Sequence, residues 1–236
     1  MQWESVKATD LGAEAARILL SAIRTNPRAV LGLPTGRTPI SMYQRVVAEC
    51  SREYHCFASA TTFNLDEYVG VPRDDPGSYF TYMREHLFAH IDIDPANAHI
   101  PDGSAADPDA ECLRYESLIR AAGGLDLTLL GLGRNGHIGF NEPGTPFDSR
   151  TRVVTLTEST RIANADVFPH GTVPTQAITM GIATILESKR IVLLVAGRGK
   201  RAAIERLRSG ERDPAFPASA LWLHDNVTIL AAEEQD

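Results

Sequence analysis

The feature that most constrains the fold is a repeated unit. In each unit a short apolar run ends at a polar or glycine-containing turn, and stretches with helical periodicity lie between the runs. Four such runs occur, at residues 29–33, 60–65, 125–130 and 190–196. Apolar residues recur at helical spacing at residues 10–25, 38–47, 79–89, 108–121 and 175–187. Strands that alternate with helices form parallel sheets covered on both faces. The sequence therefore predicts an α/β fold with a Rossmann-like, doubly wound, mostly parallel sheet and helices on both faces.

One stretch departs from this alternation. Residues 144–173 are polar, have no strong period and are flanked by prolines and glycines. Loops of this length inside a compact domain are usually functional flaps or disordered segments. We therefore predict a single domain over residues 1–236, with a mobile lid at about 144–173.

Composition excludes some partners. The chain has 23 basic and 30 acidic residues, a net charge of -7, and no Lys/Arg-rich tract that could follow a phosphodiester backbone. We expect no nucleic-acid partner. No run of 18 apolar residues occurs, and the first residues lack the pattern of a secretory signal, so we expect a cytoplasmic protein without a membrane partner.

The cysteines and histidines carry no metal-site signal. Cys50, Cys56 and Cys112 form an odd set without CxxC spacing, and we predict that all three are reduced. The histidines show neither HExxH spacing nor clustering. We expect no metal and no organic cofactor.

Ligands of an open parallel sheet bind beyond the carboxyl ends of its strands, so the segments after the four runs are the candidate site. In the first, Thr35, Gly36, Arg37 and Thr38 form a turn before a helix, whose free N–H groups and dipole favour a phosphate. The alternative is an ordinary turn in which Thr38 caps the helix.

The second segment places two adjacent carboxylates, Asp66 and Glu67, at the end of an apolar run. An Asp in this place serves as a general base if burial or a neighbouring carboxylate raises its pKa towards neutrality. The alternative is a solvated turn cap.

The third segment, residues 131–136, matches the spacing Gly-x-Gly-x-x-Gly after a strand. A dinucleotide site of this kind must open a helix, whereas the residues that follow here are poor choices for a helix interior. We predict instead a compact loop that presents Asn135, His137 and Glu142 for proton transfer near neutral pH. A structural histidine that caps a turn is the alternative.

The fourth segment, residues 196–200, includes Arg198 and ends at Lys200. It lacks the glycine spacing and the Ser or Thr of a Walker A loop. A lysine at the start of a helix still suits a phosphomonoester, although a solvated helix end is the alternative.

Together, in this order and spacing, the four segments resemble the glucosamine/galactosamine-6-phosphate isomerase family, which includes deaminases and 6-phosphogluconolactonases. The resemblance covers nearly the whole chain. It implies conversion of D-glucosamine 6-phosphate and water to D-fructose 6-phosphate and ammonium, without a cofactor. It implies that Asp66 moves the proton between C2 and C1, that His137 and Glu142 open the sugar ring with Asn135 beside them, and that the phosphate is bound by Thr35, Gly36, Arg37, Thr38 and Lys200.

Two positions depart from the family pattern. Where members carry a lid arginine that reaches the phosphate, this chain has Ala165, Asp166 and Val167, so either Arg161 or Arg152 compensates after lid closure or the substrate differs. Allosteric members of the family carry a pair of basic residues. Arg152 matches one of them and Val154 stands in place of the other, so we expect no activation by N-acetylglucosamine 6-phosphate.

Three other functions stay open at this stage. Residues 217–224 and 123–127 are similar to galactosamine-6-phosphate deaminase/isomerases, which act on the C4 epimer. A 6-phosphogluconolactonase and a non-enzymatic sugar-phosphate sensor are the further alternatives. In each case the expected partner is a small sugar phosphate, and whether the chain forms a homo-oligomer is left open.

Overall fold

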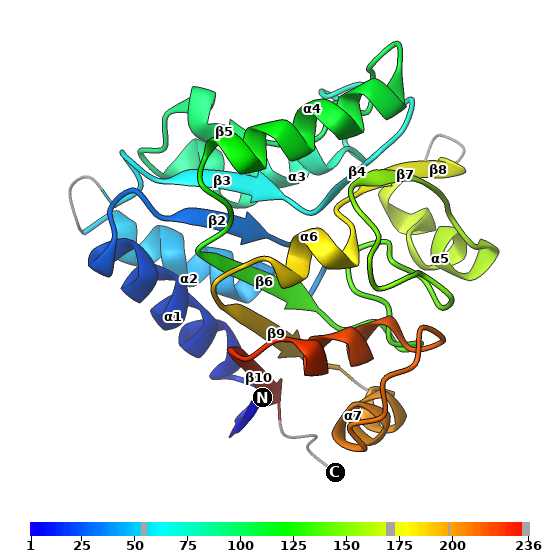
Figure 1. Ribbon diagram of the computed structural model, residues 1–236. Coiled ribbons are helices and arrows are strands. Elements are labelled where there is room, and N and C mark those ends of the chain that lie inside the picture. The colour runs from blue at the N-terminus through cyan, green and yellow to red at the C-terminus, as the bar shows by residue number, and fades with distance from the viewer. Residues whose placement is uncertain (53–55, 169–172, 198, 233–236) are drawn as a thin grey trace.

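The computed structural model describes residues 1–52, 56–168, 173–197 and 199–232. Its centre is a seven-stranded sheet in which every neighbouring pair is parallel, and a three-stranded antiparallel sheet lies beside it (Figure 1). In spatial order the large sheet comprises β1 (Gln2–Val6), β10 (Val227–Ala232), β9 (Ile191–Val195), β6 (Leu127–Gly131), β2 (Val30–Leu33), β3 (Thr61–Asn64) and β5 (Ala98–His99). The small sheet comprises β4 (Asp66–Tyr68), β8 (Gln176–Thr179) and β7 (Arg152–Thr155).

Helices cover both faces of the large sheet (Figure 1). One face packs against α1 (Leu11–Thr25), α2 (Ile40–Cys50) and α3 (Tyr79–His86), which 3-10 helix η1 (Phe88–His90) follows. The other face packs against α4 (Pro108–Ala121), α6 (Ile182–Leu186), α7 (Arg201–Arg208) and 3-10 helix η4 (Pro217–Leu223). Two further 3-10 helices are η2 (Pro95–Asn97) and η3 (Ala165–Val167), and α5 is Glu158–Ala163.

The central strands of the large sheet are buried on both sides, and successive side chains enter opposite cores. In β9, Leu194 belongs to the core under α1 and α2, whereas Leu193 belongs to the core under α4 and α7. This is why the strands of a covered parallel sheet read as continuous apolar runs rather than as alternating patterns. The predicted α/β fold with helices on both faces is confirmed.

The chain leaves β2 and β6, which are neighbours, in opposite directions. The connection from β2 to β3 passes through α2 on one face, and the connection from β6 to β9 passes through α6 on the other. Such a switch in direction opens a crevice beyond the carboxyl ends of the two strands, which is where ligands bind in this class of sheet.

Several sequence predictions need correction. The helix predicted at 175–187 is strand β8 followed by the short helix α6, because residues 176–179 pair with strands on both sides and Gly181 separates the two elements. The terminal strands β1 and β10 and the short strand β7 were not predicted. The prediction that all cysteines are reduced is wrong, since the structure joins Cys50 and Cys56 in a disulfide; Cys112 is free and buried.

The predicted lid is only partly an irregular loop. Its described part contains β7, α5 and η3, while residues 169–172 lie outside the described residues. The mobility of this segment stays a prediction. In the described part of the chain, no helix is both long and apolar enough to cross a membrane.

Candidate active site

The four predicted segments meet at one edge of the large sheet. They follow β2, β3, β6 and β9, which are adjacent and parallel, so their carboxyl ends point to the same side. Strand β4 starts two positions after the last residue of β3, and the small sheet therefore begins at this edge. Residues far apart in the sequence are brought together here.

Asp66 opens β4 and is almost completely buried. Burial raises the pKa of this carboxyl to about 8, and the charge of Glu67 adds to the effect, whereas a hydrogen bond from Thr35 opposes it. The Thr35 hydroxyl lies 3.5 Å from Oδ1. A carboxylate with such a pKa can take and return a proton near neutrality.

Glu67 is the neighbouring carboxylate, and its hydrogen bonds are already made. Its oxygens accept the backbone N–H groups of Tyr68, Tyr79 and Phe80, each at 2.9 Å. Burial raises the pKa of Glu67 to about 7, and these three donors counteract the rise. Glu67 thus anchors the start of α3 to β4, and of the two adjacent carboxylates Asp66 is the one left to the site.

Asn135 joins the two other predicted proton-transfer groups. Its amide Nδ2 donates to Glu142 Oε2 at 2.8 Å, and its Oδ1 lies 2.7 Å from His137 Nδ1. Because Oδ1 can only accept, Nδ1 must carry the proton, which leaves the lone pair on Nε2. Burial lowers the pKa of His137, as does the charge of Lys200, while Glu142 raises it from 4.0 Å away. The arrangement favours a neutral imidazole whose Nε2 carries the lone pair that can accept a proton.

The glycines of this segment make room for the histidine. A Cβ at Gly133 would lie 2.3 to 2.4 Å from atoms of the His137 ring, so a side chain there would displace the ring. Gly136 has a φ of 85°, a conformation that glycine adopts readily. No helix begins between residues 132 and 151, all of which are described. The segment therefore offers no helix N-terminus to a dinucleotide, as predicted.

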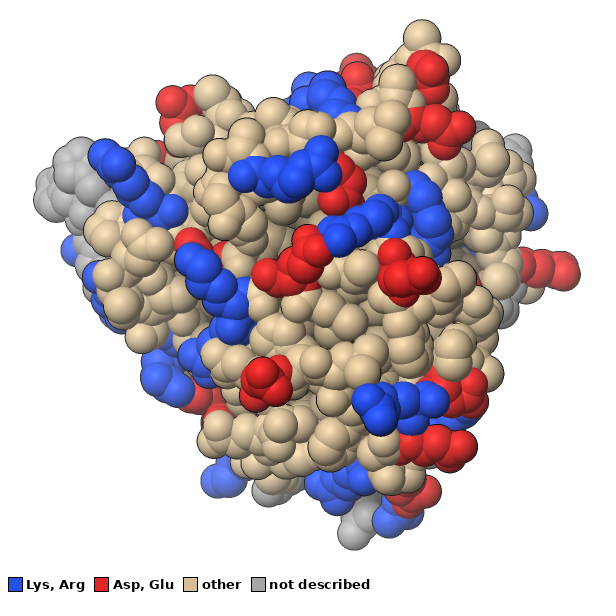
Figure 2. Space-filling view, in the orientation of Figure 1, with Lys and Arg blue, Asp and Glu red and all other residues tan. Residues whose placement is uncertain are grey.

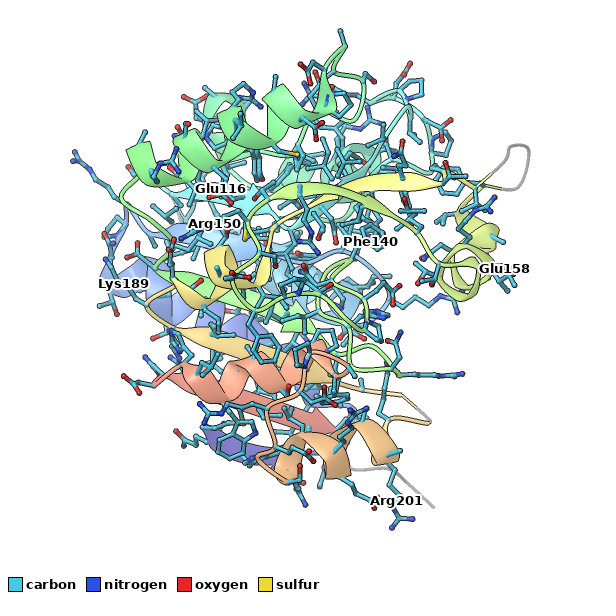
Figure 3. The ribbon with its side chains drawn as sticks, turned by 45° about the vertical axis from the view of Figure 1, so that its right-hand side comes forward. Glu116, Phe140, Arg150, Glu158, Lys189 and Arg201 are labelled. Carbon is cyan, nitrogen blue, oxygen red and sulfur yellow. A yellow bond between two sulfur atoms is a disulfide. The ribbon has the colours of Figure 1, made fainter. Side chains whose placement is uncertain are left out.

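The loop with His137 and the carboxylate of Asp66 are adjacent. A Cβ built on Gly139 would lie 3.5 Å from Asp66 Oδ2, so this glycine passes directly over the carboxylate. The next residue, Phe140 (labelled in Figure 3), is buried. Its ring packs against the ring of Tyr68 of β4, with centroids 5.5 Å apart. The structure thus brings the second and third predicted segments into contact.

The predicted phosphate-binding residues divide into two groups. Gly36 has a φ of 98° and open space around it, and Tyr82 fixes this turn by donating to the Gly36 carbonyl at 2.6 Å. Lys200 immediately precedes α7 and donates to the Leu132 carbonyl beside the histidine loop. Burial lowers the pKa of Lys200, as does the charge of Arg134. Its neighbour Arg198 lies outside the described residues.

Arg37 forms an ion pair across the site with the segment predicted as a lid. Its Nη2 lies 2.8 Å from Asp166 Oδ2, and both side chains are more than 80% exposed, at 83% and 81%. The stretch of residues 165–167, where the family pattern leads one to expect a lid arginine, therefore contacts the predicted phosphate turn through Asp166. Arg161 instead donates to the Val173 carbonyl at 3.3 Å, and Arg152 donates to Asn141 at 2.9 Å.

Sequence reasoning missed the residues that hold the far side of Glu142. Thr160 donates to Glu142 Oε1, and Thr157 lies 3.4 Å from the same oxygen. Thr157 also caps α5 by accepting the N–H of Thr160. A threonine followed by a polar residue three positions later is a helix-start signal, but nothing in that signal indicates contact with Glu142.

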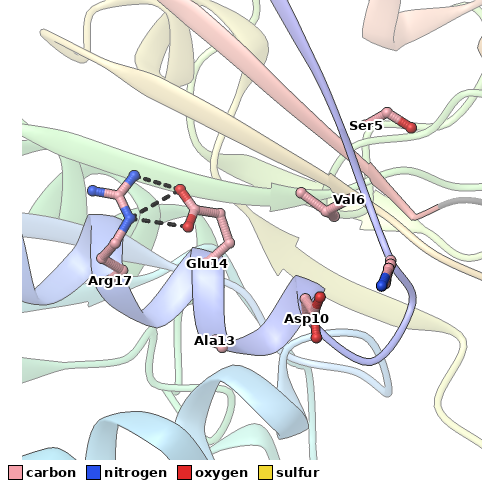
Figure 4. A pocket seen from close by; sticks show the side chains of 7 residues that line it. Ser5, Val6, Asp10, Ala13, Glu14 and Arg17 are labelled. Atoms are coloured by element: carbon pink, nitrogen blue, oxygen red, sulfur yellow. Dashed lines mark hydrogen bonds and ion pairs between the residues drawn. The ribbon is translucent and has the colours of Figure 1, made fainter.

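Two pockets show where space lies. One pocket of about 310 Å³ adjoins the loop that follows His137 and is lined by residues that include Glu142, Thr145 and Arg152. Another, of about 570 Å³, lies between the end of β1 and α1 (Figure 4). There Arg17 and Glu14 point towards one another and form hydrogen bonds, and no predicted site residue lines the pocket. We place no site there.

Basic and acidic side chains are interspersed on the face seen in Figure 2, without an expanse of positive charge. In the part of the chain that the structure describes, no group of three His, Cys, Asp or Glu side chains is placed to hold a metal ion.

The fold and the site together define an α/β protein with proton-transfer groups and cations at the carboxyl edge of a parallel sheet. The family model described as glucosamine-6-phosphate isomerases/6-phosphogluconolactonase matches residues 3–230, and the chain belongs to this family. The resemblance stated from the sequence is confirmed.

Individual relatives are similar over nearly their whole length. Glucosamine-6-phosphate deaminase 1 of Bacillus subtilis (strain 168) is 52% identical over 226 residues, which are 95% of this chain and 93% of the relative. The glucosamine-6-phosphate deaminase of Lysinibacillus sphaericus (strain C3-41) is 51% identical over 232 residues, 98% of each.

Solved structures give the same picture. A monomeric glucosamine-6-phosphate deaminase superimposes with a TM-score of 0.96 at 50% identity, covering 99% of this chain and 98% of that one. A 6-phosphogluconolactonase from Thermotoga maritima has a TM-score of 0.76 at 21% identity and 99% coverage of both chains, which is a likeness of fold alone.

Proposed function

We propose that this protein is a glucosamine-6-phosphate deaminase, which converts D-glucosamine 6-phosphate and water to D-fructose 6-phosphate and ammonium. One observation carries the proposal: the buried Asp66 carboxylate lies directly under the loop in which Asn135 joins His137 to Glu142. The reaction needs both a ring-opening group and a base for C2, and these are two distinct proton-transfer centres. The names of relatives at about 50% identity support the same activity.

Ring opening is the task of the histidine loop. With Nδ1–H held by Asn135, the Nε2 of His137 accepts the proton of the C1 hydroxyl while the bond between C1 and the ring oxygen breaks. The imidazolium then protonates the departing ring oxygen. Glu142, 4.0 Å from Nδ1, stabilises the transient positive charge.

Isomerisation is the task of Asp66. Its carboxylate removes the proton from C2 of the open-chain aldehyde and returns it to C1. A proton of the C2 amine passes through solvent to the oxygen on C1, so that C1 becomes a hydroxymethyl group and the amine becomes an imine. Water adds to this imine, and ammonia leaves as ammonium, which gives the ketone of fructose 6-phosphate. A pKa of about 8 suits both directions of proton transfer.

The phosphate is bound by the turn of Thr35, Gly36, Arg37 and Thr38, with Lys200 supplying a second positive charge. The open space over Gly36 and the position of this turn at the N-terminus of α2, where no side-chain capping hydrogen bond is made, support this assignment. Asp166 already pairs with Arg37, so a bound phosphate must compete with this carboxylate for Arg37.

A phosphorylated sugar does not cross membranes unaided, and we place the enzyme in the cytoplasm. It works as one folded unit over residues 1–236.

A panel of three substrates tests the proposal. We expect ammonium release from glucosamine 6-phosphate, little from galactosamine 6-phosphate, and no hydrolysis of 6-phosphogluconolactone. Faster turnover of the galactosamine compound would reassign the substrate, since the two differ only at C4. Inactivity on all three would refute an enzyme of this class. The mass of the protein in solution decides between monomer and homo-oligomer.

A further inference from the structure

Three residues, one from each strand of the small sheet, form a row beneath the catalytic loop. Thr179 of β8 is paired with Asp66 of β4 on one side and with Arg152 of β7 on the other. Directly opposed residues of antiparallel strands carry their side chains on the same face. Asp66, Thr179 and Arg152 therefore point to one side of the sheet.

The loop of residues 139–141 lies across this row. Gly139 passes over Asp66 and Thr179, with its Cβ position 3.5 Å from Oδ2 and 3.1 Å from Oγ1. The N–H of Phe140 donates to Thr179 Oγ1 at 3.1 Å. Arg152 Nη1 then donates to Oδ1 of the fully buried Asn141 at 2.9 Å. These contacts fix the position of the loop that leads to Glu142.

Arg152 holds the chain on both sides of Glu142. Before Glu142 it binds Asn141, whose Nδ2 donates to two backbone carbonyls at 2.9 Å. After Glu142, Arg152 Nη2 lies 3.3 Å from Thr145 Oγ1, and that hydroxyl donates to the Glu142 carbonyl at 2.7 Å. A planar guanidinium can donate in two directions from one rigid group, which a lysine ammonium cannot reproduce.

The charge of Arg152 is unusual for a purely structural contact. The side chain is half-buried, and among the described residues no carboxylate forms an ion pair with it. Burial lowers the pKa of its guanidinium, because partial desolvation costs the charged form free energy, while interaction with Cys112 raises it. It also lines the same pocket of about 310 Å³ as Glu142. A neutral donor would bind Asn141 without that cost.

We propose that Arg152, acting with Thr179, is a positioning residue that sets Glu142 and the ring-opening loop at a fixed place relative to Asp66. The inference rests on the proposed function, because it assigns a role in that same reaction. Arg152 touches no reacting atom; it acts through Asn141 and Thr145. Its loss lets the ring-opening group drift from its place while the phosphate site and Asp66 stay where they are.

The test compares Arg152→Met with Arg150→Met. Arg150 lies two residues away and pairs instead with Glu187 and Glu116, away from the loop (Figure 3). We expect Arg152→Met to lower kcat by about tenfold to a hundredfold, as small misplacements of catalytic groups do, with KM changed less than about threefold. Arg152→Lys restores part of kcat, and Thr179→Val, which is nearly isosteric, lowers kcat in the same direction. Arg150→Met keeps the wild-type kcat.

A second measurement separates positioning from general damage. An open-chain analogue, 2-amino-2-deoxyglucitol 6-phosphate, needs no ring opening, so Arg152→Met should bind it as the wild type does. Equal losses in kcat and in binding of the analogue, or an unchanged kcat, would overturn the inference.

Backbone hydrogen exchange gives a readout that does not depend on activity. Exchange over residues 138–145 should rise in Arg152→Met and not in Arg150→Met, and unchanged exchange also refutes the role. If the wild type is inactive on every sugar phosphate, the proposed function fails by itself, and exchange still decides whether Arg152 holds the loop.

Discussion

Replacing Asp66 by asparagine should abolish turnover and at the same time stabilise the fold in alkaline solution. The carboxylate is almost completely buried, with burial and then Glu67 raising its pKa from 3.8 to about 8. Each pKa unit corresponds to about 1.36 kcal/mol, so ionising Asp66 in the folded protein costs up to roughly 6 kcal/mol more than in the unfolded chain. Asparagine keeps the size of the side chain and removes this cost.

The direction of the pH dependence follows from proton linkage. Between the unfolded pKa of 3.8 and the folded pKa of about 8, the folded state holds a proton on Asp66 that the unfolded state has lost. Wild-type stability therefore falls as the pH rises through this window. The stability gain of Asp66→Asn should be near zero at the acidic end and should grow to several kcal/mol at the alkaline end.

The assay is denaturant unfolding of both proteins across that pH window, together with ammonium release from glucosamine 6-phosphate. Asp126→Asn is the matched control, with the opposite sign. Partial burial alone would raise the pKa of Asp126, but hydrogen bonds from Lys189 and the Val30 N–H lower it. That carboxylate stabilises the fold above its unfolded pKa, and Asp126→Asn should be less stable than the wild type near neutrality.

Two results would refute the reasoning. A stability difference for Asp66→Asn that does not change with pH would show that the carboxyl titrates normally in the fold. Full activity of Asp66→Asn would remove this side chain from the proton transfer between C2 and C1.

Three further substitutions test other parts of the site. Gly133→Ala places a methyl group 2.3 to 2.4 Å from the imidazole of His137 and should sharply reduce kcat, whereas Gly131→Ala, with no atom within 4 Å, should not; equal effects would exclude this steric account. Asn135→Asp adds a negative charge beside the imidazole, so an NMR titration should find its pKa raised, and an unshifted titration contradicts the proposed contact. Asp166→Asn frees Arg37 and should lower KM for the sugar phosphate by about two- to fivefold at low salt, with the difference lost at high salt, because exposed pairs contribute at most about 1 kcal/mol.

Local patterns predicted most of the central elements. The four apolar runs became β2, β3, β6 and β9, and the pattern at 108–121 became α4. The prediction of a helix around β8 was wrong, because a short stretch of Ala, Ile and Thr fits a helix or a strand equally well by periodicity. Its strand pairs with β4 and β7, which lie far away in the sequence.

The candidate site divides in the same way. Asn135, His137 and Glu142 lie within eight residues of each other, so the sequence could group them, and the structure links them through the Asn135 amide. The local pattern does not distinguish Asp66 from its neighbour Glu67, and the sequence pointed to Asp66 only through the family resemblance. The physical difference depends on which carboxylate accepts the N–H groups at the start of α3.

By itself, the sequence determined the alternation of strands and helices, the residues at the strand ends and the composition of the histidine loop, because periodicity and turn chemistry are local properties of the chain. Only the tertiary structure decided that Gly139 crosses Asp66, that Arg152 holds Asn141 and that Asp166 faces Arg37. Each of these contacts depends on strand register or on packing between distant segments, and a shift of one residue in register would turn the side chains of the small sheet to its other face.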